Sequence, residues 1–398
     1  MARNYPDNVK EHTTIVTDRK PGFLERLSDT AGGMLIGFLA FSFSFYVLFT
    51  NEGRAVQTTA SLDEGLSTVT SLSNILRIDP INEDKLVHIS GALKTSKPLY
   101  DPNYGVSIHC VKLKRQVEMY QWVEYEESKE YEENGETKRE TIYTYNTEWK
   151  SEVVSSRHFD REIAHRNPSA MAVESFTAVA SEVEVGEFSL GKGLIDKIEN
   201  FKQMSLEQMG NPHVDVTAQG DYFYQSANPK NPEVGDLRIS FWYAGVSLGS
   251  SQYGAADMVS VIARQRGEVL MPYKTKSGDT LELLYMGTHS AEEMFQEEHQ
   301  SNNFKTWALR GAGWLLMFIG VSLMTRILYT LVDWLPILRD LVSLGLKIFA
   351  LSVSASLSLM TIAAGWFFYR PLMSLVLSVF AVGILVLAKS QVPHKKYQ

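Results

Sequence analysis

This sequence lacks several features that would narrow its function at once. Its 398 residues include one cysteine, Cys110, so no disulfide can form within the chain. The net charge is -8, and no basic cluster has the density that nucleic-acid binding requires. The chain contains no P-loop, dinucleotide-binding glycine pattern or EF-hand loop. Disulfide scaffolds, nucleic-acid-binding proteins and the common nucleotide and calcium sites are therefore excluded.

Catalytic and metal patterns are also scarce. Gly245 to Gly249 matches G-x-S-x-G around Ser247, but a polar, glycine-containing segment follows it where an esterase needs a helix. His158 and His165 have no partner at zinc spacing, and His109 and Cys110 would point to opposite faces of a strand. The sequence thus predicts a non-enzymatic protein without catalytic residues, a cofactor site or a metal site.

What the chain does contain is four stretches without any Asp, Glu, Lys or Arg. They are Thr30–Asn51 with 22 residues, Gly311–Thr325 with 15, Ile348–Tyr369 with 22 and Pro371–Ala388 with 18. About 20 apolar residues in a helix cross the hydrocarbon core, and a helix satisfies its own backbone hydrogen bonds there. The fold class expected is therefore a four-span α-helical membrane protein with a large β-rich α+β soluble domain between the first two spans.

The expected domain organisation follows from these stretches. Its segments are an N-tail at 1–29, transmembrane helix 1 at 30–51, a lumenal α+β domain at 52–306, transmembrane helix 2 at 307–325, an amphipathic interfacial segment at 326–347, transmembrane helix 3 at 348–369, transmembrane helix 4 at 371–388 and a basic C-tail at 389–398.

Lysine and arginine in the short flanking segments set the expected orientation. The N-tail carries Arg3, Lys10, Arg19, Lys20 and Arg26, and the C-tail carries Lys389, Lys395 and Lys396. The positive-inside rule then places both termini in the cytosol or nucleoplasm and the soluble domain in the lumen.

The second span is short, at about 22 Å for 15 helical residues. Arg310 and Arg326 bracket it and could snorkel outward, and Trp307, Trp314 and Trp334 suit an aromatic belt. The alternative is a buried helix of a soluble domain.

A long hairpin is the clearest local structure of the soluble insert. Asn134-Gly135 favours a type I′ turn, and both flanks are rich in Tyr, Trp, Val and Thr. Pairing outward from the turn sets Glu130 opposite Arg139, Lys129 opposite Glu140 and Tyr120 opposite Trp149.

Further elements follow from β-branched runs and helical spacing. Strands are expected at Leu86–Leu93, Val106–Leu113, Leu237–Val246, Met258–Gln265 and Thr280–Met286. Helices are expected from Asn167 to about Ala178, over Leu194–Met209, and after a capping box formed by Ser290 and Glu293.

The segment 326–347 carries charges at intervals of seven. They are Arg326, Asp333, Asp340 and Lys347, which share one narrow stripe of a helix. Either this helix lies in the headgroup layer with its charges toward water, or the stripe is a seam that meets a partner helix or lines a polar path.

The third span repeats small residues. Gly345, Ser352, Ala355 and Ser356 form a candidate packing face within the protein or between copies, because small residues let helices approach closely. Alternatively, the serine hydroxyls bond back to carbonyls of their own helix.

With these segments in place, the chain resembles the transmembrane protein 43 family, also called LUMA. The strings that carry the resemblance are PGFLERL at 21–27, FTNEGRA at 49–55, DPNYGV at 101–106, VEMYQWVE at 117–124, NPSAMAVESF at 167–176, VIARQRG at 261–267, MTRILYTLVDW at 324–334 and AAGWFFYRPL at 363–372.

The resemblance implies a protein of the endoplasmic reticulum and inner nuclear membrane. It also implies self-association and partnership with lamins and emerin-like proteins in organising the nuclear envelope. The family supplies no catalytic residues. The leading hypothesis is therefore a non-enzymatic membrane scaffold, and the alternative is a component or regulator of a membrane channel or transport complex.

Overall fold

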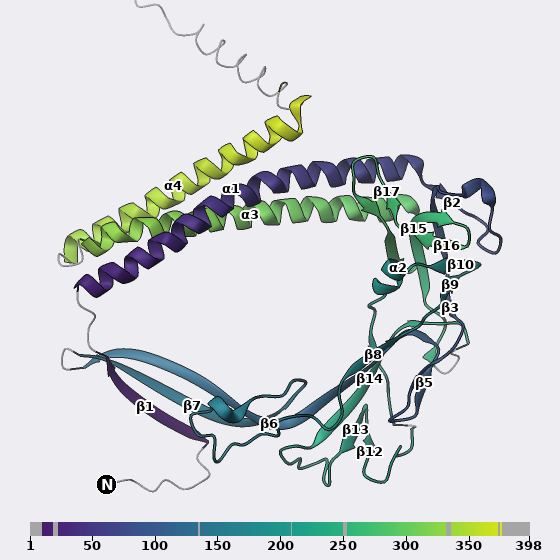
Figure 1. The fold of residues 1–398 in the computed structure, drawn as a ribbon, viewed down its shortest axis with the longest axis horizontal. Helices are drawn as coiled ribbons and strands as arrows, with labels where there is room; N and C mark the ends of the chain where they lie inside the picture. Colours follow the sequence, from purple (N-terminus) through teal and green to yellow (C-terminus); the bar gives the residue numbers. More distant parts are fainter. Residues whose placement is uncertain are drawn as a thin grey trace, which may run out of the picture. The chain divides into compact units, whose positions relative to one another are not determined.

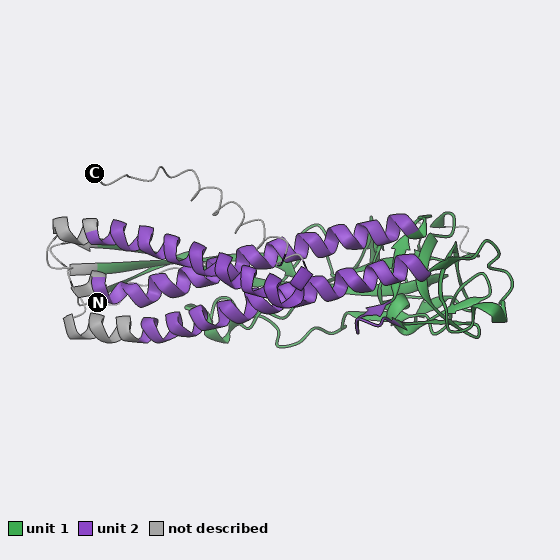
Figure 2. Cartoon of the chain, turned by 90° about the horizontal axis from the view of Figure 1, so that it is seen from above, with its two compact units in different colours: residues 1–20, 69–273, 282–291 green, residues 21–68, 274–281, 292–398 purple. Residues whose placement is uncertain are grey.

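The computed structural model describes residues 10–18, 23–133, 136–207, 209–249, 253–331, 336–372 and 375. The chain divides into two compact units (Figure 2). Unit 1 contains residues 1–20, 69–273 and 282–291, and unit 2 contains residues 21–68, 274–281 and 292–398. Unit 1 is built mainly from β-strands, whereas unit 2 is built from long helices (Figure 1).

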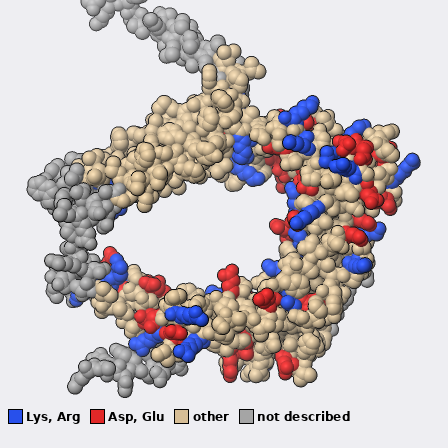
Figure 3. All heavy atoms as spheres, in the orientation of Figure 1, with Lys and Arg blue, Asp and Glu red and all other residues tan. Residues whose placement is uncertain are grey.

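Among its described residues, unit 2 contains three helices that greatly exceed the thickness of a bilayer core. They are α1 (Phe23–Thr68, 46 residues), α3 (Ala291–Leu331, 41 residues) and α4 (Pro336–Tyr369, 34 residues). About 20 residues suffice for a span, so α1 and α3 continue well beyond the apolar region. Figure 3 shows the apolar part of these helices as a surface almost without Lys, Arg, Asp or Glu.

The predicted four-span architecture is wrong. Among the described residues, three helices are long and apolar enough to cross a membrane, over Gly32–Thr68, Ala291–Leu328 and Val342–Tyr369. The segment 371–388, predicted as transmembrane helix 4, lies largely outside the described residues. The expectation that both termini emerge on one side depended on an even number of spans, and it loses that support.

The helix boundaries differ from the predicted domain boundaries. α1 runs through residue 51 to Thr68, and α3 begins at Ala291, where the Ser290–Glu293 pattern predicted a helix start. The soluble insert therefore begins and ends as helix. The predicted interfacial segment 326–347 belongs to two helices, because α3 ends at Leu331 and α4 begins at Pro336. Proline suits the first helical turn, because a backbone N–H at that position would have no partner within the helix.

Unit 1 contains two main sheets. The first has the order β1 (Glu11–Asp18), β7 (Glu136–Lys150), β6 (Cys110–Glu133), β14 (Leu237–Val246), β13 (Tyr222–Gln225) and β12 (Thr217–Gln219), with β8 (Phe176–Val179) on β6 and β11 (Lys202–Gln203) on β14. The second has the order β19 (Leu283–Met286), β15 (Met258–Arg266), β16 (Val269–Met271), β10 (Phe188–Leu190), β9 (Val183–Val185), β3 (Leu86–Thr95) and β2 (Thr70–Ser71).

The second sheet closes on itself. β15 pairs antiparallel with both β16 and β3, so the strands β3, β9, β10, β16 and β15 form a closed ring. A closed ring removes exposed strand edges. Its interior is filled by buried aliphatic side chains and an aromatic one, including Ile89, Val185, Phe188 and Val261. Short elements complete the chain: β4 (Leu99–Asp101), β5 (Val106–Ile108), β17 (Tyr273–Lys274), β18 (Thr280–Leu281), α2 (Lys192–Asp196) and 3-10 turns at Pro80–Asn82 and Ser156–His158.

The predicted hairpin is confirmed with its register. β6 and β7 pair Glu130 with Arg139, Lys129 with Glu140 and Tyr120 with Trp149. Arg139 bonds Glu130 at 2.8 Å, and the rings of Tyr120 and Trp149 lie 5.1 Å apart. The turn residues 134–135 lie outside the described residues. The five strand predictions are also confirmed by β3, β5 with β6, β14, β15, and β18 with β19.

The helix predicted from Asn167 is wrong. Residues 167–175 form no helix, and Phe176–Val179 is strand β8. The Asn167 side chain instead accepts a hydrogen bond from the Trp122 N–H at 2.7 Å and donates to the Trp122 and Val154 carbonyls. It therefore acts as a strand partner for β6. The helix predicted over Leu194–Met209 is also shorter, since α2 ends at Asp196.

The N-terminal strand bears on the expected orientation. β1 pairs with β7 from Glu11 opposite Thr144 to Asp18 opposite Thr137. Paired strands must lie in one compartment, whereas a helix that crosses the bilayer once between them would separate them. The expected placement of residues 1–29 and 52–306 in opposite compartments therefore cannot hold together with this pairing.

Candidate functional site

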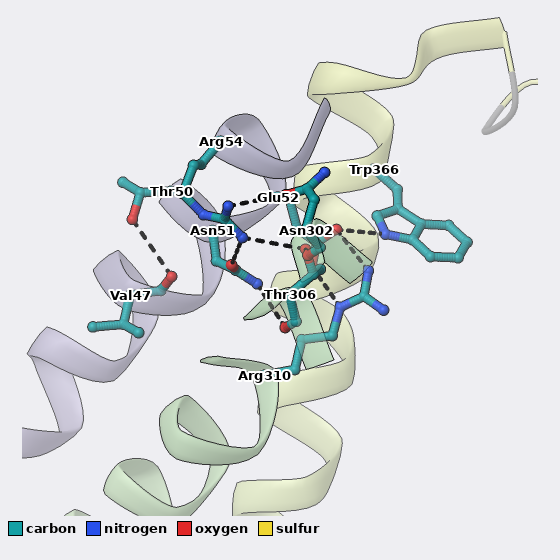
Figure 4. Close-up of polar contacts among 9 residues, drawn as sticks. All are labelled: Val47, Thr50, Asn51, Glu52, Arg54, Asn302, Thr306, Arg310 and Trp366. Carbon is teal, nitrogen blue, oxygen red and sulfur yellow. Dashed lines mark hydrogen bonds and ion pairs between the residues drawn. The ribbon is translucent and has the colours of Figure 1, made fainter. Parts of the chain in front are cut away.

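The most unusual polar site of unit 2 is a buried ion pair among its three helices (Figure 4). Glu52 follows the uncharged residues 30–51 on α1, and its side chain is fully buried. Arg310 precedes the uncharged residues 311–325 on α3. Its Nε and Nη2 donate to the two carboxylate oxygens of Glu52 at 2.7 and 2.8 Å. This two-pronged geometry is the strong form of the arginine–carboxylate interaction.

The third helix completes the site through Trp366. The indole Nε1–H of Trp366 on α4 donates to Glu52 Oε2 at 2.8 Å. The Arg310 guanidinium lies 4.7 Å from the Trp307 ring centroid and 5.6 Å from that of Trp366. The carboxylate thus has three donors, and the cation lies between two aromatic faces. Arg310 was expected to snorkel outward, yet its side chain is only 11% exposed because it turns toward Glu52.

Glycines allow α4 to approach this pair. A Cβ placed on Gly365 would lie 2.9 Å from Glu52 Cγ, and one on Gly53 would lie 2.6 Å from the Tyr369 ring. The same holds between α1 and α3, where a Cβ on Gly37 would lie 2.9 Å from the Gly320 carbonyl oxygen. Small residues at such contacts let helix backbones pack closely.

A second polar layer lies beside the ion pair and joins α1 to α3 (Figure 4). Asn51 donates to the Thr306 carbonyl at 3.1 Å. Arg54 donates to Asn302 Oδ1 at 3.0 Å, to Asn51 Oδ1 at 3.1 Å and to Thr306 Oγ1 at 3.2 Å. Asn302 in turn donates to the Ala55 carbonyl at 3.1 Å. These bonds fix the register of α1 against α3, because a shift by one residue would leave buried polar groups without partners.

Comparison with known proteins identifies the family of this chain. The family described as Transmembrane protein 43 matches residues 119–371. The chain is 59% identical to "Transmembrane protein 43" of Mus musculus and 58% identical to that of Homo sapiens, over 400 residues and 100% of each chain. The chain belongs to the transmembrane protein 43 family.

A more distant member shows the breadth of this family. "Transmembrane protein 43 homolog" of Drosophila melanogaster is 33% identical over 346 residues, which cover 85% of this chain and 89% of that protein. No solved structure matches the chain significantly.

Two of the strings that resemble the family supply part of the buried site, although Arg310 lies outside them. FTNEGRA at 49–55 supplies Asn51, Glu52 and Arg54, and AAGWFFYRPL at 363–372 supplies Gly365 and Trp366. None of the sequence patterns described above predicted this site. The available signal was the pair of opposite charges at the ends of two uncharged runs, which antiparallel helices bring to the same level.

The predicted charged stripe does not lie on one helix. Arg326 belongs to α3, Asp340 and Lys347 belong to α4, and Asp333 lies outside the described residues. The structure nevertheless brings Arg326 and Lys347 together, because both line one cavity between the two helices.

The predicted packing face is mostly turned away from the protein's own helices. Gly345, Ser352 and Ser356 are exposed, and Ala355 is half-buried. The buried face of α4 has Ala350, Ser354 and Ser358 instead. Ser354 bonds back to the Leu351 carbonyl at 3.1 Å, and Ser358 contacts Met317 Sδ at 3.5 Å.

Ser247 and His165, which were considered above for catalysis and for zinc binding, have structural roles. Ser247 is buried, and its hydroxyl oxygen accepts hydrogen bonds from Thr95 N at 2.8 Å and Thr95 Oγ1 at 3.0 Å. His165 stacks on Tyr145 with ring centroids 3.8 Å apart. Within the described part of the chain, no group of three His, Cys, Asp or Glu side chains could hold a metal ion.

Proposed function

We propose that this protein is a non-enzymatic membrane scaffold. It self-associates and helps to organise the endoplasmic reticulum and nuclear envelope, including protein complexes of the inner nuclear membrane. The observation that carries the proposal is a helical unit that neutralises its buried Glu52 internally while it leaves an apolar, small-residue face of α4 open. Unit 2 pairs Glu52 with Arg310 and Trp366, so its three helices dock without a ligand.

The self-association interface lies on α4. Gly345, Ser352, Ser356 and Ala363 are exposed, and their spacing keeps them within about 40° of one another on a helix. A Cβ on Gly345 would meet no atom within 4 Å. A helix of a second copy can therefore approach this stripe closely, and the serines can donate hydrogen bonds across the contact.

Family membership supports the location and the partners. The resemblance to the transmembrane protein 43 family implies residence in the endoplasmic reticulum and inner nuclear membrane, with lamins and emerin-like proteins as partners. The channel alternative gains no support from the described residues, because the one buried carboxylate of the spans is neutralised by Arg310.

Self-association is tested with two differently tagged copies in one membrane. The copies are cross-linked, one tag is purified, and the amount of the other tag that co-purifies is measured. Ser352→Leu should strongly reduce co-purification of the copies, because the bulky side chain separates the helices. Ala364→Leu is the matched control, since Ala364 is also exposed but lies about 120° away around α4. Co-purification that is equal in both variants would refute this interface.

A protease-protection experiment tests the orientation. The basic N-tail supports a cytosolic or nucleoplasmic N-terminus. One tag is placed at the N-terminus and another at the tip of the β6–β7 hairpin. If β1 pairs with β7 in the membrane-embedded protein, both tags lie in one compartment, so the protease should cleave both or neither. Opposite protection would show that this pairing is absent there.

A further inference from the structure

The cavity between α3 and α4 lies at the opposite end of the apolar helices from the Glu52 ion pair. Its volume is about 200 Å³, and it is lined by Ser322, Thr325, Arg326, Ser343, Leu346 and Lys347. Pockets for drug-sized ligands measure about 300–1,000 Å³. This cavity is therefore large enough for a small group such as a lipid headgroup phosphate, but not for a whole cofactor.

The lining is mostly apolar, but its polar side chains are two cations and three hydroxyl groups, which suit an anion. Arg326 from α3 and Lys347 from α4 are exposed at its rim, so two cations from different helices meet at one opening. Arg326 has five N–H donors, which lets it keep an intramolecular partner and still bind a ligand. Ser322 and Ser343 bring hydroxyl groups, whereas the Thr325 hydroxyl already donates to the Val321 carbonyl at 2.9 Å. Arginine and lysine with hydroxyls form a typical environment for phosphate.

The position of the cavity favours a phosphate that belongs to a lipid over a phosphate that is free in solution. Arg326 directly follows the uncharged residues 311–325, and Lys347 directly precedes the uncharged residues 348–369. Both cations therefore lie where apolar helix meets the headgroup layer. From Arg310 to Arg326 the helix rises about 24 Å, close to the thickness of a hydrocarbon core. Basic pockets between helices at this depth are suited to anionic lipid headgroups.

We propose that this cavity binds the phosphate of an anionic phospholipid headgroup. Arg326 and Lys347 grip the phosphate oxygens from two helices, and the Ser322 and Ser343 hydroxyls add hydrogen bonds. The acyl chains of the lipid lie along the apolar surfaces of α3 and α4. The bound lipid thus joins the two helices at the end that the Glu52 pair does not reach. This inference is independent of the self-association proposed above.

Binding of short-chain phosphatidic acid to the purified full-length protein in detergent tests the proposal. Native mass spectrometry measures the lipid-bound fraction during a titration. Arg326→Gln and Lys347→Gln should each weaken binding by about tenfold, as expected for the loss of a charge-assisted hydrogen bond. Lys305→Gln is the matched control, because Lys305 is exposed on α3 outside the cavity and the charge change is the same. If Arg326→Gln and Lys347→Gln bound the lipid as tightly as the control Lys305→Gln, the proposal would be overturned.

Three further measurements keep the test decisive. Short-chain phosphatidylcholine should bind much more weakly, and equal binding would show an apolar groove without headgroup selectivity. Glycerol 3-phosphate should also bind weakly, and binding as tight as that of the lipid would assign the cavity to a soluble phosphate compound. If the charge variants fold poorly, Ser343→Leu fills the cavity without removing a charge and should abolish binding. Retained binding in Ser343→Leu would also refute the site.

Discussion

The Glu52 carboxylate and the Arg310 guanidinium form a two-pronged ion pair although they lie 258 positions apart in the sequence. The residues between them include nearly all of the β-rich unit 1, so the pair closes a very long loop. The structural effect of the pair is confined to the helices of unit 2. The pair joins α1 to α3 where their uncharged runs end, and Trp366 adds α4 to the same carboxylate.

Neutralising Glu52 should destabilise unit 2 strongly. Glu52→Gln leaves the Arg310 cation buried without a charged partner, which should cost about 3–5 kcal/mol. Thermal unfolding in detergent, followed by tryptophan fluorescence, measures the change. The control Glu297→Gln removes an exposed carboxylate of α3 and should stay within about 0.5 kcal/mol of the unmodified protein. The double variant Glu52→Met with Arg310→Met should be more stable than Glu52→Gln, since no buried charge remains. A double variant less stable than Glu52→Gln would contradict this account.

Two glycines of α4 should respond in opposite ways to alanine. Gly365→Ala places a methyl group 2.9 Å from Glu52 Cγ and should cost about 1–3 kcal/mol by forcing α4 away from α1. Within a single copy, Gly345→Ala meets open space and should stabilise α4 by up to about 1 kcal/mol through helix propensity. The same unfolding measurement compares the variants. A neutral or stabilising Gly365→Ala would argue that the close approach at Gly365 is not limiting, and a destabilising Gly345→Ala would argue that Gly345 is packed.

A second buried ion pair should control the stability of unit 1. Arg115 donates to Asp101 Oδ2 at 2.8 Å, with the two side chains 8% and 0% exposed. Asp101 Oδ1 also accepts from the backbone N–H groups of Asn103 and Tyr104. Asp101→Ala should therefore cost about 3–5 kcal/mol. Limited proteolysis with mass spectrometry should show earlier cleavage within unit 1.

The control for this pair is an exposed one. Lys94 and Glu184 lie at 2.8 Å but are 53% and 36% exposed, so Glu184→Gln should cost at most about 1 kcal/mol. Proteolysis as fast as in Asp101→Ala would show that burial does not distinguish the two pairs.

Cys110 should be inert in the folded protein. Burial raises the pKa of its thiol to about 12, and its Sγ donates to the Lys112 carbonyl at 3.3 Å. The thiolate is the reactive form, so iodoacetamide should label Cys110 quickly only after unfolding. Mass spectrometry of native and denatured samples measures both rates. Rapid labelling of the native protein at pH 8 would disprove the burial.

The raised pKa of Cys110 also gives a pH dependence of stability. Above an ordinary pKa of 9.0 the unfolded thiol loses its proton while the folded one keeps it. The contribution to stability is therefore complete below pH 9 and is lost as the pH rises toward about 12, by up to about 1.4 kcal/mol per unit. Cys110→Ala should show a shallower loss over this range than the unmodified protein.

Local sequence signals predicted the parts of this fold that depend on near neighbours. The Asn134-Gly135 dipeptide and its flanks fixed the β6–β7 register, because a hairpin pairs residues outward from its turn. Ser290 and Glu293 marked the start of α3, since capping involves only the first helical turn. Asn167 misled the helix prediction, because its side chain finds partners on β6, 45 residues away.

By itself, then, the sequence determined that helices with long uncharged stretches flank a β-rich insert and that no familiar catalytic or metal pattern is present. Only the tertiary structure decided that three helices, rather than four, are long and apolar enough to span a membrane among the described residues. It also decided which face of α4 is buried, and that Glu52, Arg310 and Trp366 meet. The physical reason is that apolar composition and hydrogen bonds within a helix are local properties of the chain. The partner of a buried charge is chosen by helix packing, which brings together residues that no sequence spacing connects.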